Sequence, residues 1–408
     1  MSLSTDVIFD RLNEYFITRF GMTGNVQTLF RFQKWGSGIS DQDAIDPDQP
    51  GLGYQHARAV EAVSTLADHV PNLSGDNLSL SLNLQSSTAD RYYSELLRDS
   101  EPYVVVGADE QSADFFTRAF TSMKAEAIRR WTNAPLEAHS GVPMRFKPVL
   151  ATPDAWYDPA RKDLWSNASF EVSADMEGFP SPQEPGIWRI APSQPVLALH
   201  QAEPPSDGTT SALAAAIRMA REYPDAVSVT TEDSSDGESR VAVSSDEVQR
   251  LRLEDRLLLE ELLATQVQTV STAVNTATIA FDYCVVQINR PWWYDIFVND
   301  GTWYVPGTAA CALTLDDSSK GMPFVTSGMV LVRNLLISGS WEQIDVESAQ
   351  RAMSSFGPFN VDSGVADGQL AYPHVQTIGW PGVRSVPSAP PPPPAARLAP
   401  TPPQRRSR

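Results

Sequence analysis

The strongest constraint on the fold is a pair of apolar segments, residues 278–288 and 329–338, which are rich in Val, Ile and Leu. Each is short and carries the β-branched content that is typical of a buried strand. Helical periodicity recurs elsewhere without a regular strand–helix–strand rhythm. The sequence therefore predicts an α+β fold, with a helical N-terminal part and a mixed or antiparallel sheet core.

Periodicity places the remaining elements. Apolar residues recurring every three or four positions predict helices at residues 6–20, 54–70, 89–99, 111–131 and 209–222. A capping-box pattern at 244–247 predicts a longer helix, whose apolar face would hold Leu259, Leu263, Val267, Val270 and Val274. Alternation predicts strands at 78–84 and 375–380 and a hairpin of 227–231 with 240–244. The proline-rich stretch 134–205 predicts irregular structure with short strands.

Charge and cysteine content narrow the function classes. The formal net charge of −19 over 408 residues opposes a phosphate backbone, so no nucleic-acid partner is expected. The longest uncharged window, residues 262–281, is too polar to span a membrane, and no secretory leader is visible at the start. Only Cys284 and Cys311 are present, which excludes a disulfide framework and a cysteine-based zinc site. We expect a cytoplasmic protein without cofactor or metal.

The composition changes sharply at Pro387. Residues 390–394 are five consecutive prolines, and the charged residues that follow are all arginines. We expect a globular body over residues 1–386, with a possible inserted unit at about 205–244, and a disordered polyproline II tail over 387–408. In the tail, Pro400, Pro403 and Arg405 fit a P-x-x-P-x-R ligand for an aromatic groove. A tail that only solubilises or tethers is the alternative interpretation.

An aromatic-rich corner follows the first core strand, at residues 288–297 and 302–306. One hypothesis is a binding platform on which rings stack against a ligand and an arginine holds an anion. Its residues would be Asn289, Arg290, Trp292, Trp293, Asp295 and Trp303. The alternative is a structural corner, in which the rings are buried and Arg290 bonds to carbonyl groups.

Four short segments carry a resemblance to a known group of proteins. They are the N-R-P-W stretch at 289–292, the W-Y-D-P corner at 156–159, the Arg333–Asn334 pair in a strand and the G-P-F turn at 357–359. Together they resemble a loosely defined family of uncharacterised microbial proteins. The resemblance implies a shared fold between about residues 150 and 382, and it implies no catalytic residues.

The leading functional hypothesis is a non-catalytic structural or interaction protein. No nucleophile elbow, phosphate-binding loop or metal-binding motif occurs, and the five histidines are scattered. The partner would be another protein, or a second copy reached through the tail. Two alternatives stay open: a protein that binds a carbohydrate or another planar or polar ligand at the aromatic corner, and a hydrolase that combines Asp or Glu with a histidine such as His374.

Overall fold

The fold is that of a computed structural model. It describes residues 5–20, 28–37, 39–46, 49–68, 71–74, 77–80, 88–103, 108–138, 145–173, 188–190, 220–221, 223, 227–231, 239–243, 251, 253, 255–256, 259, 268–270, 274–300, 303–306, 324–343, 345, 354–361, 365–366 and 369–384. The 387–408 tail, Cys311 and most of the helices expected at 209–222 and after 244–247 lie outside these residues.

The chain forms two compact units. The first, called the sheet unit, comprises Met1–Thr88, Leu136–Arg290 and Phe324–Arg384. The second, called the helical unit, has its described residues within Ala89–Pro135 and Pro291–Pro323. The expectation of one body over 1–386 did not separate them. The chain passes between the units at positions where the sequence shows no abrupt change of composition.

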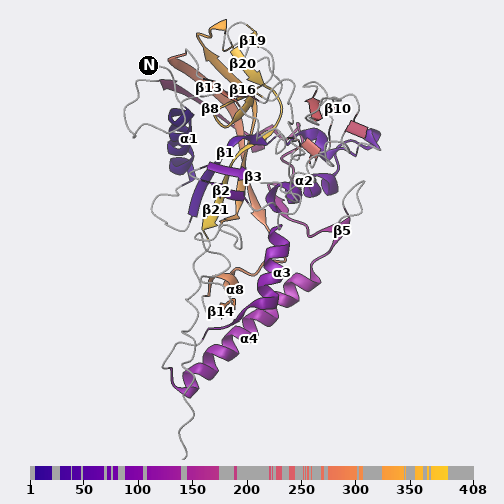
Figure 1. The fold of residues 1–408 in the computed structure, drawn as a ribbon, viewed down its shortest axis with the longest axis vertical. Helices are drawn as coiled ribbons and strands as arrows, with labels where there is room; N and C mark the ends of the chain where they lie inside the picture. Colours follow the sequence, from indigo (N-terminus) through magenta and orange to yellow (C-terminus); the bar gives the residue numbers. More distant parts are fainter. Residues whose placement is uncertain are drawn as a thin grey trace, which may run out of the picture. The chain divides into compact units, whose positions relative to one another are not determined.

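The sheet unit is built on a large, mostly antiparallel sheet (Figure 1). Eleven strands of the described part join it: β1 (Thr28–Ser37), β2 (Pro71–Ser74), β3 (Asn77–Leu80), β7 (Leu150–Thr152), β8 (Ser166–Ser173), β13 (Thr276–Asn289), β15 (Phe324–Thr326), β16 (Gly328–Gly339), β19 (Val365–Ala366), β20 (Gln369–Tyr372) and β21 (Gln376–Arg384). β13 pairs with β16 along one edge and with β7 and β8 along the other. The β1–β3 pairing is parallel, so the sheet is mixed. The α+β class and the three predicted core strands are confirmed.

The remaining strands of the described residues form smaller sheets. β9 (Trp188–Ile190), β12 (Gln268–Val270), β17 (Ser354–Phe356) and β18 (Phe359–Val361) form a four-stranded sheet. The predicted hairpin is confirmed as β10 (Val227–Thr231) paired with β11 (Ser239–Val243). Two short pairs remain among the described residues: β5 (Glu137–Ala138) with β6 (Arg145–Phe146), and β4 (Glu101–Pro102) with β14 (Trp303–Tyr304).

The helices follow the predicted segments closely. They are α1 (Thr5–Phe20), α2 (His56–Asp68), α3 (Ala89–Asp99), α4 (Glu110–Asn133) and the short α8 (Asp295–Asn299), together with the 3₁₀ turns η1 (Asp41–Ala44), η2 (Pro50–Leu52) and η3 (Lys162–Leu164). α4 begins where the Asp109 side chain accepts a hydrogen bond from the Ser112 backbone N–H at 2.7 Å. The first four predicted helices are therefore confirmed.

Two parts of the secondary-structure prediction need correction. Gln268–Val270 is strand β12, although Val267 and Val270 were expected on a helix face. β-branched residues lose side-chain freedom in a helix and pack well on a pleated surface, which favours the strand. β8 is an eight-residue strand of the main sheet inside the stretch expected to be irregular. Its buried Ala168 and Val172 alternate with exposed polar residues, a pattern that the prolines around it obscured.

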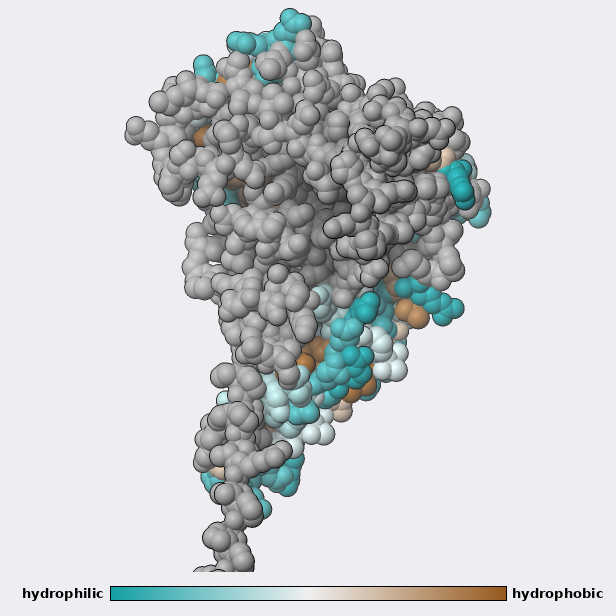
Figure 2. Space-filling view, in the orientation of Figure 1, coloured by the Kyte–Doolittle hydropathy of each residue, from teal (hydrophilic) through white to brown (hydrophobic). Residues whose placement is uncertain are grey.

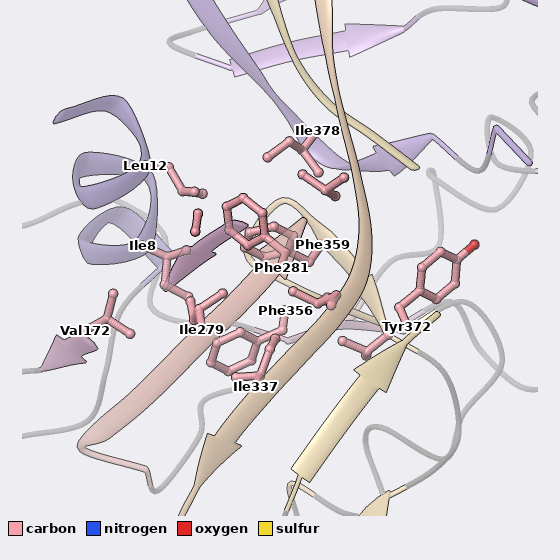
Figure 3. Packing of buried hydrophobic residues seen from close by; sticks show 14 of the residues in the cluster. Ile8, Leu12, Val172, Ile279, Phe281, Ile337, Phe356, Phe359, Tyr372 and Ile378 are labelled. Carbon is pink, nitrogen blue, oxygen red and sulfur yellow. The ribbon is translucent and has the colours of Figure 1, made fainter. Parts of the chain in front are cut away.

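The core of the sheet unit lies between α1 and the sheet. Figure 3 shows Ile8 and Leu12 of α1 directed toward Phe281 of β13 and Phe359 of β18. Phe281 and Phe359 have ring centroids 5.5 Å apart. Since an aromatic ring buries a large apolar area, this contact joins the large sheet to the four-stranded sheet and fixes one face of β13.

The turn between β17 and β18 requires glycine. Gly357 has φ = 58°, and an added Cβ would lie 3.1 Å from Cγ2 of Ile8. We expect Gly357→Ala to lower the free energy of unfolding by about 1–2 kcal/mol, because an L residue is strained in this region and the core has no room. Urea unfolding measures the change. Gly51→Ala is the matched control, since its Cβ would meet nothing within 4 Å. Equal stability of the two variants would contradict this account of the turn.

Candidate interaction site

Arg290 connects three segments within the sheet unit. Its Nη1 donates to the Thr326 carbonyl at 2.6 Å, and its Nη2 donates to the Ala67 carbonyl at 2.7 Å and to Oγ1 of Thr326 at 2.8 Å. Ala67 lies in the last turn of α2, where carbonyls lack intrahelical partners and the helix dipole is negative. Arg290 is 8 % exposed. Its guanidinium therefore caps α2 and ties the helix to β15, as the structural interpretation of the corner expects.

The tryptophans predicted for ligand binding are buried. Trp292, Trp293 and Trp303 are 0 %, 8 % and 1 % exposed. In the helical unit, the Tyr93 ring of α3 stacks on Trp293 at 4.6 Å and contacts Trp292 at 5.8 Å. Trp303 stacks on Phe297 at 5.9 Å and donates its Nε1–H to the Phe297 carbonyl at 2.8 Å. The faces that a ligand would use already contact protein.

The remaining predicted residues are divided between surface and tail. Asn289, at the end of β13, and Asp295, at the start of α8, are exposed. Pro400, Pro403 and Arg405 lie outside the described residues. Among the six corner residues, Arg290 therefore bonds within the sheet unit, and the indoles pack within the helical unit.

A different aromatic pair lies at the surface of the sheet unit. Tyr54, just before α2, and Tyr157, in the turn after β7, have ring centroids 6.0 Å apart. Tyr54 donates its hydroxyl hydrogen to Oδ2 of Asp41 at 2.9 Å. Asp154 and Asp158 flank Tyr157 in the sequence. We call these five residues the acidic tyrosine surface.

Buried neighbours hold the two tyrosines in place. Tyr157 packs edge-on against buried Trp156, with the centroids 5.6 Å apart. Tyr54 pairs with Ile45 in an isolated antiparallel bridge, and the next backbone N–H, of Gln55, donates to the Ala44 carbonyl at 2.6 Å. The rings are thus fixed by backbone bonds and by an indole in the core. Such pre-ordered rings lose little conformational entropy when they bind.

The acidic tyrosine surface carries negative charge. Burial, the hydrogen bond to Asp41 and the nearby charge of Asp158 raise the pKa of Tyr54 to about 12. Burial, then the charges of Asp154 and Asp158, raises the pKa of Tyr157. Both phenols therefore stay protonated at neutral pH and the charge belongs to the aspartates. Arg161 lies on the same loop. Its Nε and Nη2 donate to Asp163 at 2.9 Å, and Asp163, followed by the charges of Asp158 and Asp154, raises the pKa of Arg161.

Open space surrounds part of the acidic tyrosine surface. Tyr54 is 37 % exposed and Leu52, two residues earlier, is 65 % exposed. Cβ atoms built on Gly51 and Gly53 meet nothing within 4 Å. Exposed apolar and aromatic groups on a pre-ordered loop are what a protein-binding surface requires.

The W-Y-D-P corner is visible in the sequence, but its pairing with Tyr54 is not. About one hundred residues separate Tyr54 from Tyr157 in the chain. The signals that could have found the surface are the aspartates around each tyrosine and the Asp-, Pro- and Gly-rich loop at 36–53.

The Arg333–Asn334 segment forms a polar cluster on β16. Asp282 of β13 accepts from Nδ2 of Asn334 at 2.8 Å and from Nδ2 of Asn167 at 3.3 Å. The Arg333 guanidinium lies 4.1 Å from the centroid of Trp165. Asn334 has φ = 52° beside a bulge in the β13–β16 register. The Asp282 carboxylate therefore pairs with both amides beside the bulge, where the regular strand ladder is disrupted.

His374, the histidine of the hydrolase alternative, is exposed and packs against Tyr372 at 5.5 Å. In the described part of the chain, no group of three or more His, Cys, Asp or Glu residues gathers as metal ligands would. None of the helices seen there is long and apolar enough to cross a membrane.

In the helical unit, α4 presents mostly polar atoms interrupted by small apolar patches (Figure 2). Its Phe115 and Ile128 are 68 % and 42 % exposed. The two residues are thirteen positions apart, which puts their side chains on nearly opposite faces of the helix, so they do not form one apolar stripe.

Comparison of the chain with protein-family models, curated proteins and solved structures finds no match.

Proposed function

We propose that this is a non-catalytic interaction protein that self-associates through its proline- and arginine-rich segment, residues 387–408. The segment contains Arg397, Arg405, Arg406 and Arg408 and no acidic residue. The observation that supports the proposal is the acidic tyrosine surface, where Tyr54 and Asp154 are exposed beside the half-buried Tyr157, Asp41 and Asp158.

The physical basis is the recognition of proline-rich segments. A polyproline II segment is ordered before binding, so it loses little entropy when its prolines pack against aromatic rings. A flanking arginine then gains from a nearby carboxylate, and its planar fork can donate two parallel hydrogen bonds. The fit of Pro400, Pro403 and Arg405 to P-x-x-P-x-R supplies both elements.

Sedimentation velocity tests the proposed function. The full chain is compared with a tail-neutral variant, in which the four tail arginines are replaced by alanine within the full-length protein. We expect the natural chain to sediment faster as its concentration rises, and the tail-neutral variant to stay monomeric with unchanged circular dichroism. Identical sedimentation of both proteins at every concentration would exclude tail-driven self-association.

A further inference from the structure

We infer that the receptor for the C-terminal segment is the acidic tyrosine surface of a second copy of this chain. This inference rests on the proposed function and goes beyond it by naming the docking residues. The described body exposes other large apolar side chains, at Phe115, Ile128, Leu136, Leu150 and Ile296. Tyr54 and half-buried Tyr157 combine ring contact with three neighbouring aspartates. The rings of Phe115 and Phe116 also contact each other, at 5.9 Å, but the neighbouring Asp114 already pairs with Arg118.

The chemistry of the two partners matches group by group. Prolines pack best on flat, electron-rich rings, and the tilted tyrosine pair at 6.0 Å presents two of them. The aspartates supply the anionic partner for Arg405. Asp154 is exposed, and its carboxylate accepts no hydrogen bond from the described residues, whereas Asp158 already accepts from the Ala160 N–H at 2.8 Å. Asp154 is therefore the carboxylate that we assign to arginine binding.

The sequence favours docking on another copy over docking on the same one. The described body ends at Arg384 in β21, and residues 390–394 follow as five prolines. Proline has a fixed φ and no N–H donor, so such a run is stiff and extends by about 3.1 Å per residue. A stiff spacer before the binding motif makes it harder for the motif to turn back onto the body that carries it. Reciprocal docking would give a closed pair, and one-way docking a chain of copies.

Fluorescence anisotropy with a labelled peptide of residues 387–408 tests the inference. The receptor is the full-length tail-neutral variant, so its own segment does not compete. Tyr54→Ala and Asp154→Asn are compared with the matched control Phe115→Ala, which removes an exposed ring from the helical unit. Tyr54→Phe, which keeps the ring without its hydroxyl, separates the contribution of the ring from that of the hydroxyl.

We expect Tyr54→Ala to weaken peptide binding by about tenfold or more, as loss of a central aromatic contact does. Asp154→Asn should weaken it severalfold, mainly at low salt. Tyr54→Phe should weaken binding less than Tyr54→Ala does, because it keeps the ring, and Phe115→Ala should bind as the tail-neutral receptor does. If the peptide binds equally well to all four variants, the assigned surface is wrong while the proposed function survives. If the peptide does not bind the receptor at all, both fail.

Discussion

Replacement of Arg290 by methionine is expected to lower the free energy of unfolding of the sheet unit by about 2–3 kcal/mol. Methionine keeps the apolar stem but removes the donors that bond to Ala67 and Thr326. Their buried carbonyls then lose charge-assisted hydrogen bonds, and α2 loses its C-terminal positive charge. Urea unfolding of the full chain measures the difference.

The control for Arg290 is an arginine at the surface of the same unit. Arg11 pairs with Glu14 on α1 and is 37 % exposed, so Arg11→Met should change stability by less than about 0.5 kcal/mol. The loss of stability in Arg290→Lys should lie between those of Arg290→Met and Arg11→Met. A lysine ammonium cannot bond to both carbonyls as the planar guanidinium does. A residue kept for ligand recognition would behave differently, with stability unchanged or improved on substitution. That outcome would revive the binding-platform hypothesis.

Trp303→Ala is expected to destabilise the helical unit by about 3–5 kcal/mol, the range found when a buried aromatic residue is truncated. The substitution removes the stacking on Phe297, the Nε1 hydrogen bond to the Phe297 carbonyl and a nearly fully buried ring. Trp303→Phe keeps most of the ring contact. It should lower the free energy of unfolding by about 1 kcal/mol, because the hydrogen bond is missing.

Hydrogen exchange of the α4 amides reports on the helical unit, because α4 packs against α8 just before Trp303. Exchange should accelerate strongly in Trp303→Ala. It should hardly change in Phe115→Ala, whose ring is 68 % exposed on the same helix. Equal protection in the two variants would show that Trp303 is not a structural residue.

The sequence predicted the elements that carry their own periodicity. Helix 89–99 was placed at its observed bounds, because Tyr93, Leu96 and Leu97 form one buried face. The strands at 278–288 and 329–338 were found because both are strongly apolar. β1 was missed, since residues such as Arg31, Gln33 and Lys34 break its apolar character and its pairing partner, β21, is some 350 residues away.

The candidate site was harder to predict than the fold. Whether an indole is buried depends on its distant partners. Tyr93 covers Trp293 and its hydroxyl accepts a hydrogen bond from the Tyr294 N–H, 201 residues later. The sequence is therefore compatible both with a ligand-binding platform and with a buried structural corner at residues 288–297. The Tyr54–Tyr157 pair went unnoticed for the same reason, since each tyrosine alone is an ordinary loop residue.

A mixing experiment tests the central claim most directly. The Tyr54→Ala chain keeps the segment but lacks the receptor ring, and the tail-neutral chain keeps the receptor but lacks the arginines. Each should sediment as a monomer alone, and the two should form a one-to-one heterodimer when mixed. A mixture that stays monomeric, or either protein assembling alone as the natural chain does, would contradict docking of the C-terminal segment on the acidic tyrosine surface of a second copy.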